Sequence, residues 1–225
     1  MTARLHDFIM QTVIFIPPNA RRPLVMFLNA LIYTTLIDPL LSGLRKTVVE
    51  NINQPATVID IACGPGTLAF QIAEKASHVT GIDLDEGAIS HASSRAKKRG
   101  AGNLTFDIRD ASDLSSFHDG QFDVAVTSMA VHQFPEELAV QILKEMSRIA
   151  KAVIIADYNC PMPRGISRSL AYGIEYIAKG DHYRNFMNYM KRGGVGWFTA
   201  EAGLTIRSTN IRGNGVFVVA VCDTK

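Results

Sequence analysis

The stretch from Val58 to Ala73, Val-Ile-Asp-Ile-Ala-Cys-Gly-Pro-Gly-Thr-Leu-Ala-Phe-Gln-Ile-Ala, is the part of the chain that best indicates its fold. The apolar run at 58–61 predicts a buried strand, and Gly64-Pro65-Gly66 predicts a sharp turn. Residues 67–76 carry apolar side chains at helical spacing. Glycines let a ligand approach the backbone closely, and the start of the helix offers free N–H groups. The stretch therefore predicts a nucleotide-type cofactor site.

The residues that follow alternate between strand and helix patterns. Strands are expected at 79–84, 104–108, 122–127 and 151–156, and helices at 86–99 and 136–150. Two more strands, 204–211 and 216–221, flank Arg212-Gly-Asn-Gly215, and an Asn-Gly pair in so short a link predicts a hairpin. These patterns predict an α/β fold with a Rossmann-like, doubly wound, mostly parallel seven-stranded sheet and an antiparallel C-terminal hairpin strand.

The domain organisation is expected to have two parts. Residues 1–54 are predicted as an N-terminal helical extension or lid, and 55–225 as the main domain with a helical insertion at about 158–202. The apolar segment at 24–41 is nearly long enough to span a membrane, but Asn29, Asp38 and Pro39 interrupt it. We therefore expect amphipathic helices there, with membrane contact that is at most peripheral.

Composition narrows the classes of function. The net charge is +2, and no basic stripe with interleaved aromatic residues indicates nucleic-acid binding. The three cysteines are odd in number and lack the spacing of metal ligands, so we expect no disulfide framework, no metal and a cytoplasmic location. The oligomeric state is left open, with a homodimer as one option.

The second predicted strand ends in an acid that helps to indicate which type of cofactor binds. Asp83 lies about 20 residues after the turn, where a carboxylate at the end of a strand can bind both ribose hydroxyls. Asp85 is expected to cap the helix that follows, which leaves Asp83 for a ligand. A dinucleotide site is disfavoured because the third glycine of its pattern is missing, and a phosphate loop is excluded because no Gly-Lys-Ser/Thr follows the turn.

Four segments in this order resemble the class I S-adenosylmethionine-dependent methyltransferases. They are Asp60-Ile-Ala-Cys-Gly-Pro-Gly66, Gly81-Ile-Asp83, Arg109-Asp-Ala111 and Phe122-Asp-Val-Ala-Val-Thr-Ser-Met-Ala-Val-His-Gln-Phe-Pro135. The resemblance covers roughly residues 40–160 and the final hairpin, and it implies S-adenosylmethionine as the cofactor. Ala62 departs from the family pattern, which has glycine there, and a methyl group is acceptable at this position if the backbone is unstrained.

The resemblance also implies which residues bind the cofactor. Asp60 would lie near the methionine amino group, Asp83 would hold the ribose, and Asp110 with the Ala111 N–H would bind adenine. Ser128 and Met129 would flank the methionine and the reacting sulfonium. The full set of expected cofactor residues is Tyr33, Asp60, Ala62, Gly64, Gly66, Asp83, Leu84, Asp110, Ala111, Ser128 and Met129.

The sequence indicates the residues that bind the methyl acceptor less clearly than those that bind the cofactor. Methyl transfer mainly requires alignment, and a base is needed only when the acceptor must lose a proton. The candidates are His132, Asp157, Tyr158, His182 and Tyr183, each of which has an ordinary structural role as its alternative. The aromatic and methionine residues of 183–198 favour a small hydrophobic or aromatic acceptor if they line a pocket. The rival function is a non-catalytic S-adenosylmethionine-binding protein or partner subunit with the same fold.

Overall fold

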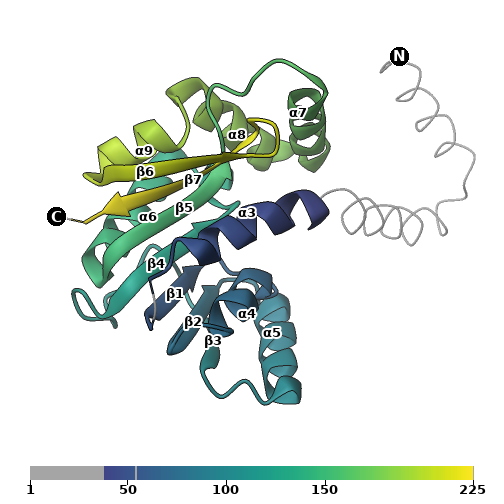
Figure 1. The fold of residues 1–225 in the computed structure, drawn as a ribbon. Helices are drawn as coiled ribbons and strands as arrows, with labels where there is room; N and C mark the ends of the chain where they lie inside the picture. The colour runs from purple at the N-terminus through teal and green to yellow at the C-terminus, as the bar shows by residue number, and fades with distance from the viewer. Residues whose placement is uncertain (1–37, 54, 225) are drawn as a thin grey trace, which may run out of the picture. The chain divides into compact units, whose positions relative to one another are not determined.

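The computed structural model describes residues 38–53 and 55–224. Their strands form one seven-stranded sheet in the order β3-β2-β1-β4-β5-β7-β6 (Figure 1). The strands are β1 (Thr57–Ile61), β2 (His78–Asp83), β3 (Leu104–Ile108), β4 (Phe122–Ser128), β5 (Ala150–Tyr158), β6 (Thr205–Arg212) and β7 (Phe217–Asp223). The pairs from β3 to β5 are parallel, whereas β7 runs antiparallel to both β5 and β6. The predicted doubly wound sheet with an antiparallel C-terminal strand is confirmed.

Helices cover both faces of this sheet. Figure 1 shows α3, α4 and α5 on one face and α6 and α9 on the other. The described helices are α3 (Asp38–Glu50), α4 (Thr67–Ala73), α5 (Glu86–Arg99), η2 (Val131–Gln133), α6 (Glu136–Ile149), α7 (Ile166–Ala178), α8 (Gly180–Arg192) and α9 (Val195–Ala202). Because both faces are covered, strands such as β1 are buried almost throughout, which explains why most of their residues are apolar.

Local capping defines the ends of the helices. Asp85 accepts a hydrogen bond from the Ala88 N–H at 2.9 Å, as expected, and Gly100 ends α5 in a left-handed conformation. The helix after the turn ends at Ala73 rather than at the predicted residue 76. The reason is tertiary, since the Asn103 amide donates to the carbonyls of Ala73 and Ala76 and terminates the helix there.

The fifth strand is longer than predicted. Asp157 and Tyr158, expected after the strand, are its last two residues. They pair with Val218 and Phe217 of the antiparallel strand β7, so the hairpin extends β5. This pairing keeps the backbone of both residues fully extended and buried.

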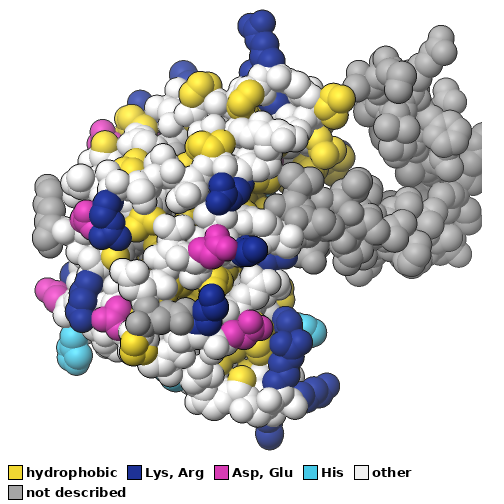
Figure 2. All heavy atoms as spheres, viewed as in Figure 1, with side chains coloured by type: hydrophobic (Ala, Val, Ile, Leu, Met, Phe, Trp, Pro, Cys, Tyr) yellow, Lys and Arg dark blue, Asp and Glu magenta, His cyan; other side chains and the backbone are white. Residues whose placement is uncertain are grey.

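The surface of the described residues is mixed in charge. Figure 2 shows Lys and Arg side chains interspersed with Asp and Glu on the face in view. Among the described residues, none of the helices has the length and apolar content that crossing a bilayer would require.

Two glycines accommodate an aromatic ring beside the turn. A Cβ added to Gly66 would lie 2.5 Å from the Phe106 ring, and one added to Gly81 would lie 2.6 Å from it. The Phe106 ring also packs against Phe70, with ring centroids 5.7 Å apart. Gly66 in addition has φ +76°, whereas a Cβ on Gly64, with φ +52°, would meet nothing within 4 Å. Packing therefore requires glycine at 66, and only backbone conformation favours it at 64.

This difference predicts unequal effects on stability. Gly66→Ala should lower the free energy of unfolding by at least about 2 kcal/mol, because it adds overpacking to left-handed strain. Gly64→Ala, the matched control, should cost about 1 kcal/mol from strain alone. Urea denaturation without ligand measures both values.

A double-mutant cycle isolates the ring contact. In a Phe106→Ala background the cost of Gly66→Ala should fall to that of Gly64→Ala, since the clash is removed. Equal costs with and without the Phe106 ring would contradict this explanation of Gly66.

Candidate functional site

Three carboxylates lie at the carboxyl ends of neighbouring parallel strands. Asp60 is the penultimate residue of β1, Asp83 ends β2, and Asp110 follows β3 by two residues. Because these strands are parallel, their carboxyl ends share one edge of the sheet. The chain order reverses between β1 and β4, which is where ligands bind in open α/β sheets.

Asp60 is a buried acid with spare hydrogen-bonding capacity. Its residue is 1% exposed, and within the described part of the chain Oδ2 has no hydrogen-bond partner. Burial, reinforced by the charge of Asp83, raises the pKa of Asp60 to about 8. A buried carboxyl in this state is suited to a ligand that brings a positive charge or a hydrogen-bond donor.

Backbone groups of the turn orient Asp83. The Gly64 N–H donates to Asp83 Oδ2 at 2.7 Å, and the Asp85 N–H donates to Oδ1 at 2.9 Å. Each oxygen keeps a lone pair for a ligand. The turn and the second-strand acid, 19 residues apart, are thus one hydrogen-bonded unit.

The backbone at Ala62 is strained. The expectation that alanine is acceptable here assumed an unstrained backbone, and that assumption does not hold. Ala62 has φ +58°, in the left-handed region that non-glycine residues rarely adopt. The cost is about 1 kcal/mol for an ordinary residue. The glycine that the family pattern has at this position would avoid it, whereas Ala62 is held by the turn around it.

A carboxylate and exposed apolar side chains lie at the carboxyl ends of β2 and β3. The Ser112 N–H and hydroxyl both donate to Asp110 Oδ1 at 2.8 Å, which fixes the carboxylate and leaves Oδ2 for a ligand. Leu84 and Ile108, at the ends of β2 and β3, are 64% and 56% exposed. Sequence reasoning named Leu84 and missed Ile108, although the apolar end of a strand just before Arg109-Asp110 was a usable signal.

The fourth strand ends beside this edge. Ser128 and Met129 are half-buried, and Met129 has φ +57°. The Met129 N–H donates to the Ala156 carbonyl of β5 at 2.8 Å, so the turn out of β4 is tied to its neighbour. Ala111 is half-buried, and Tyr33 lies outside the described residues.

A second polar cluster lies next to the β4 turn and is deeply buried. His132 Nδ1 lies 2.6 Å from Asp157 Oδ1, and His132 Nε2 lies 3.6 Å from Glu175 Oε1. His182 Nε2 lies 2.6 Å from Glu175 Oε2, and the Tyr158 hydroxyl donates to Glu175 Oε1 at 2.7 Å. The structure therefore brings four of the five predicted acceptor-side residues together around Glu175, which the sequence analysis missed.

In this cluster, the nearby carboxylates and burial have opposite effects on the pKa of His132. Burial alone would lower the pKa of His132, but Asp157 and then Glu175 outweigh it, and the pKa is raised overall. Burial, together with Glu175, raises the pKa of the Tyr158 hydroxyl, which therefore stays protonated. The two carboxylates thus offset the effect of burial on the pKa of His132.

Tyr183 lies apart from these contacts. Its ring packs edge-on against Tyr176, with centroids 5.4 Å apart, and lies 6.4 Å from the ring of Phe186. Glu175 could have been found from the sequence by one signal, a single acid within the apolar run of α7. Such an acid is buried only when it is paired.

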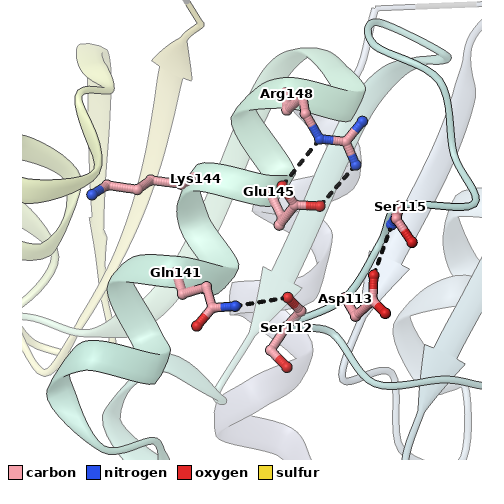
Figure 3. Close-up of a pocket in the computed structure, with 7 residues that line it drawn as sticks. All are labelled: Ser112, Asp113, Ser115, Gln141, Lys144, Glu145 and Arg148. Carbon is pink, nitrogen blue, oxygen red and sulfur yellow. Dashed lines mark hydrogen bonds and ion pairs between the residues drawn. The ribbon is translucent and has the colours of Figure 1, made fainter.

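A surface hollow elsewhere has a structural explanation. Figure 3 shows the Arg148 guanidinium pointing at Glu145 of the same helix, to which it donates at 2.7 and 3.0 Å. Arg148 also donates to the carbonyls of Leu114 and Phe117, which ties the loop after β3 to α6. The hollow is lined by Ser112, Asp113, Ser115, Gln141, Lys144, Glu145 and Arg148. None of these residues is itself a strand-end carboxylate or a member of the buried cluster, although Ser112 donates to Asp110, and we assign the hollow no functional role.

Comparisons with known proteins agree with this geometry. Residues 58–152 match the family model described as a methyltransferase domain. The 2-heptyl-1-hydroxyquinolin-4(1H)-one methyltransferase of Mycobacteroides abscessus is 36% identical over 91 residues, which cover 40% of each chain. The chain spans between 30% and 63% of the length of eight curated relatives that it matches.

Solved structures share the fold. The PH0226 protein of Pyrococcus horikoshii superposes with a TM-score of 0.67 at 22% identity, over 85% of this chain and 92% of that one. The magnesium protoporphyrin IX methyltransferase of Synechocystis, solved with bound SAH, superposes with a TM-score of 0.58 at 17% identity, over 84% of this chain and 83% of that one. The matched segment, the sheet order and the strand-end carboxylates agree with one another, and residues 58–152 are therefore similar to the methyltransferase domain of class I S-adenosylmethionine-dependent methyltransferases.

Proposed function

We propose that this protein transfers a methyl group from S-adenosylmethionine to a small hydrophobic or aromatic molecule. The observation that carries the proposal is the convergence of Asp60, the Gly64 turn and Asp83 at the point where the sheet order reverses. This arrangement places a buried acid, with one oxygen that has no partner among the described residues, beside a second acid that is oriented by the turn. The donor set suits a ligand with a cationic end and a ribose.

The residues at the sheet edge fit the parts of this cofactor in order. Asp60 would accept from the amino group of the methionine part, and Asp83 from the ribose hydroxyls. Asp110 and the Ala111 N–H would bind the adenine edge, with exposed Leu84 and Ile108 against its faces. The open space at Gly64 supports close ligand approach there, whereas packing of Phe106 already explains Gly66. When bound, the cofactor supplies a methyl group activated by its sulfonium.

What remains for the protein is alignment of the acceptor with that methyl group. We propose that the acceptor binds between the turn at Ser128 and Met129 and the residues of η2, α7 and α8. His182 and Tyr183 are half-buried, so a small molecule could contact them directly. His132, Asp157 and Tyr158 are buried and would act through them as positioning residues.

The hydrophobic character of the acceptor has two supports. Leu170, Tyr176 and Met187 of α7 and α8 are large apolar residues with 40% or more of their surface exposed. The two methyltransferases named above act, by their names, on a heptyl-substituted quinolinone and on magnesium protoporphyrin IX. Both names describe large ring systems, which matches the aromatic residues of α7 and α8.

We also propose a cytoplasmic location, for which the support is chemical. Cys63, Cys160 and Cys222 are all free thiols, as expected in a reducing compartment. The rival function is that of a binding protein or partner subunit without turnover. The same cofactor-binding residues are compatible with it, because a fold does not determine which reaction, if any, a protein catalyses. Transfer of labelled methyl groups into small molecules of a cell extract separates the two, since binding without any labelled product would favour the rival.

The ribose role of Asp83 predicts a loss of cofactor affinity. Asp83→Ala should weaken S-adenosylhomocysteine binding by on the order of 1.5–3 kcal/mol, because hydrogen bonds to a charged group are lost. Calorimetry measures the effect, and Asp107→Ala, an exposed acid on the neighbouring strand β3, is the matched control. An unchanged dissociation constant for Asp83→Ala would contradict the assigned role.

The raised pKa of Asp60 predicts a pH-dependent affinity. Below about pH 8 the free protein holds this carboxyl protonated, whereas the ligand's ammonium favours the ionised form, so binding releases a proton. From pH 5.5 to 7 the affinity for S-adenosylhomocysteine should therefore rise, by up to about tenfold per pH unit. Asp60→Asn should flatten this rise. A wild-type affinity that is constant over the range would show that Asp60 does not face the ligand's charge.

A further inference from the structure

The buried cluster beside β4 contains three groups of the kind that bind metal ions. His132, Glu175 and His182 each offer one ligand atom, and these atoms all lie within 4.8 Å of one another. The three residues come from η2, α7 and α8. Their spacing in the chain, 43 and then 7 residues, follows no local metal-binding pattern. This is why the sequence analysis, which considered cysteine spacing, expected no metal.

Three potential ligand atoms lie close together in this cluster. Asp157 Oδ1 lies 2.6 Å from His132 Nδ1 and accepts a hydrogen bond from it, so that the neutral form of His132 has its lone pair on Nε2. Nε2 faces Glu175 Oε1 across 3.6 Å. On the other oxygen of Glu175, His182 Nε2 lies at 2.6 Å. Two imidazole nitrogens and a carboxylate thus converge, and a metal ion bound there would replace the proton between His182 and Glu175.

The distances suit a four-coordinate ion with little rearrangement. Ligand atoms of a tetrahedral site with bonds of about 2.0 Å lie about 3.3 Å apart. The His132–Glu175 separation of 3.6 Å is already close to this value. The His182–Glu175 separation of 2.6 Å must open by less than about 1 Å, and the half-exposed His182 side chain is free to make such a shift.

Neighbouring residues form hydrogen bonds to the candidate ligands, as the residues around the ligands of known metal sites do. A carboxylate on the second nitrogen of a ligating histidine fixes its orientation and raises its basicity, and Asp157 stands in that position. The Tyr158 hydroxyl donates to Glu175 at 2.7 Å and orients that carboxylate. His132 and Glu175 are 1% and 4% exposed, whereas the His182 side chain is 32% exposed. The cluster is therefore closed on one side and accessible on the other, where a fourth ligand could bind.

We propose that His132 Nε2, the Glu175 carboxylate and His182 Nε2 bind one divalent first-row metal ion of the zinc type. Two imidazoles and one carboxylate are a ligand set of catalytic zinc sites, which keep a further position open. Mg²⁺ and Ca²⁺ are disfavoured because they prefer oxygen ligands. The inference goes beyond methyl transfer and does not depend on it. The competing arrangement is a shared-proton network, with a His132 imidazolium held between two carboxylates.

Metal titration of the full chain distinguishes these arrangements. The protein is purified without a histidine tag, treated with a chelator and titrated with Zn²⁺ by calorimetry. We expect one Zn²⁺ per chain, and Co²⁺ should show the visible absorption of a four-coordinate ion. Absence of stoichiometric Zn²⁺ binding would overturn the proposal in favour of the proton network.

Variants assign the binding to these residues. Glu175→Gln and His182→Ala should each weaken Zn²⁺ binding at least tenfold, and Asp157→Asn about 10- to 100-fold through His132. The matched control is His91→Asn with His118→Asn, which removes two exposed histidines elsewhere and should leave the affinity unchanged. Binding that survives Glu175→Gln and His182→Ala but is lost in Cys160→Ser would place the ion at a thiol and overturn the proposal.

Binding of S-adenosylhomocysteine to the same samples serves as an independent check on folding. A variant that retains this binding but loses Zn²⁺ has lost the metal site alone. A wild-type chain that binds Zn²⁺ but not S-adenosylhomocysteine would instead refute the proposed cofactor while supporting the metal site. Thermal unfolding adds a further readout, since Zn²⁺ should raise the Tm of the wild type but not that of Glu175→Gln.

Discussion

The parallel pairing of β1 with β2 on one side and with β4 on the other is the constraint on which the site depends. It aligns Asp60 with Gly81 and with Val126, so the strands end at one edge. The turn after β1 can then donate from Gly64 to Asp83 at the end of β2. A register shift of one residue in β2 would move the Asp83 carboxylate to the opposite face and break this contact.

The same edge carries two polar sites of different character. Of the strand-end acids, Asp83 and Asp110 are partly or fully exposed and are held by backbone N–H groups, an arrangement suited to a ligand that enters and leaves. The cluster around Glu175 is enclosed by aromatic rings, with Tyr158 and Phe186 at 4.8 and 6.1 Å from the His132 ring. Charges buried this deeply are retained only when they are paired. The cluster thus holds the cap helices α7 and α8 against the end of the sheet, in addition to any ion that it binds.

Much of the fold was predictable because its signals are local. The strand and helix patterns, the Asp85 cap and the Asn-Gly hairpin each depend on fewer than about 15 consecutive residues. The errors lie where distant residues intervene. The Asn103 amide ends α4 early, and pairing with Phe217 extends β5 to Tyr158. The left-handed backbone of Ala62 was also invisible in the sequence, because the turn around that residue imposes it.

By itself, the sequence determined the class of fold, the succession of strands and helices along the chain, and the type of cofactor to which the turn at 62–66 and Asp83 point. These depend on periodicity and on residue types at short spacing, which a single chain displays directly. Only the tertiary structure decided that Phe106 occupies the space at Gly66, that one oxygen of Asp60 has no partner among the described residues, and that Glu175 joins two histidines. The physical reason is that such contacts join residues on separate elements, whose meeting is set by sheet register and helix packing rather than by spacing along the chain.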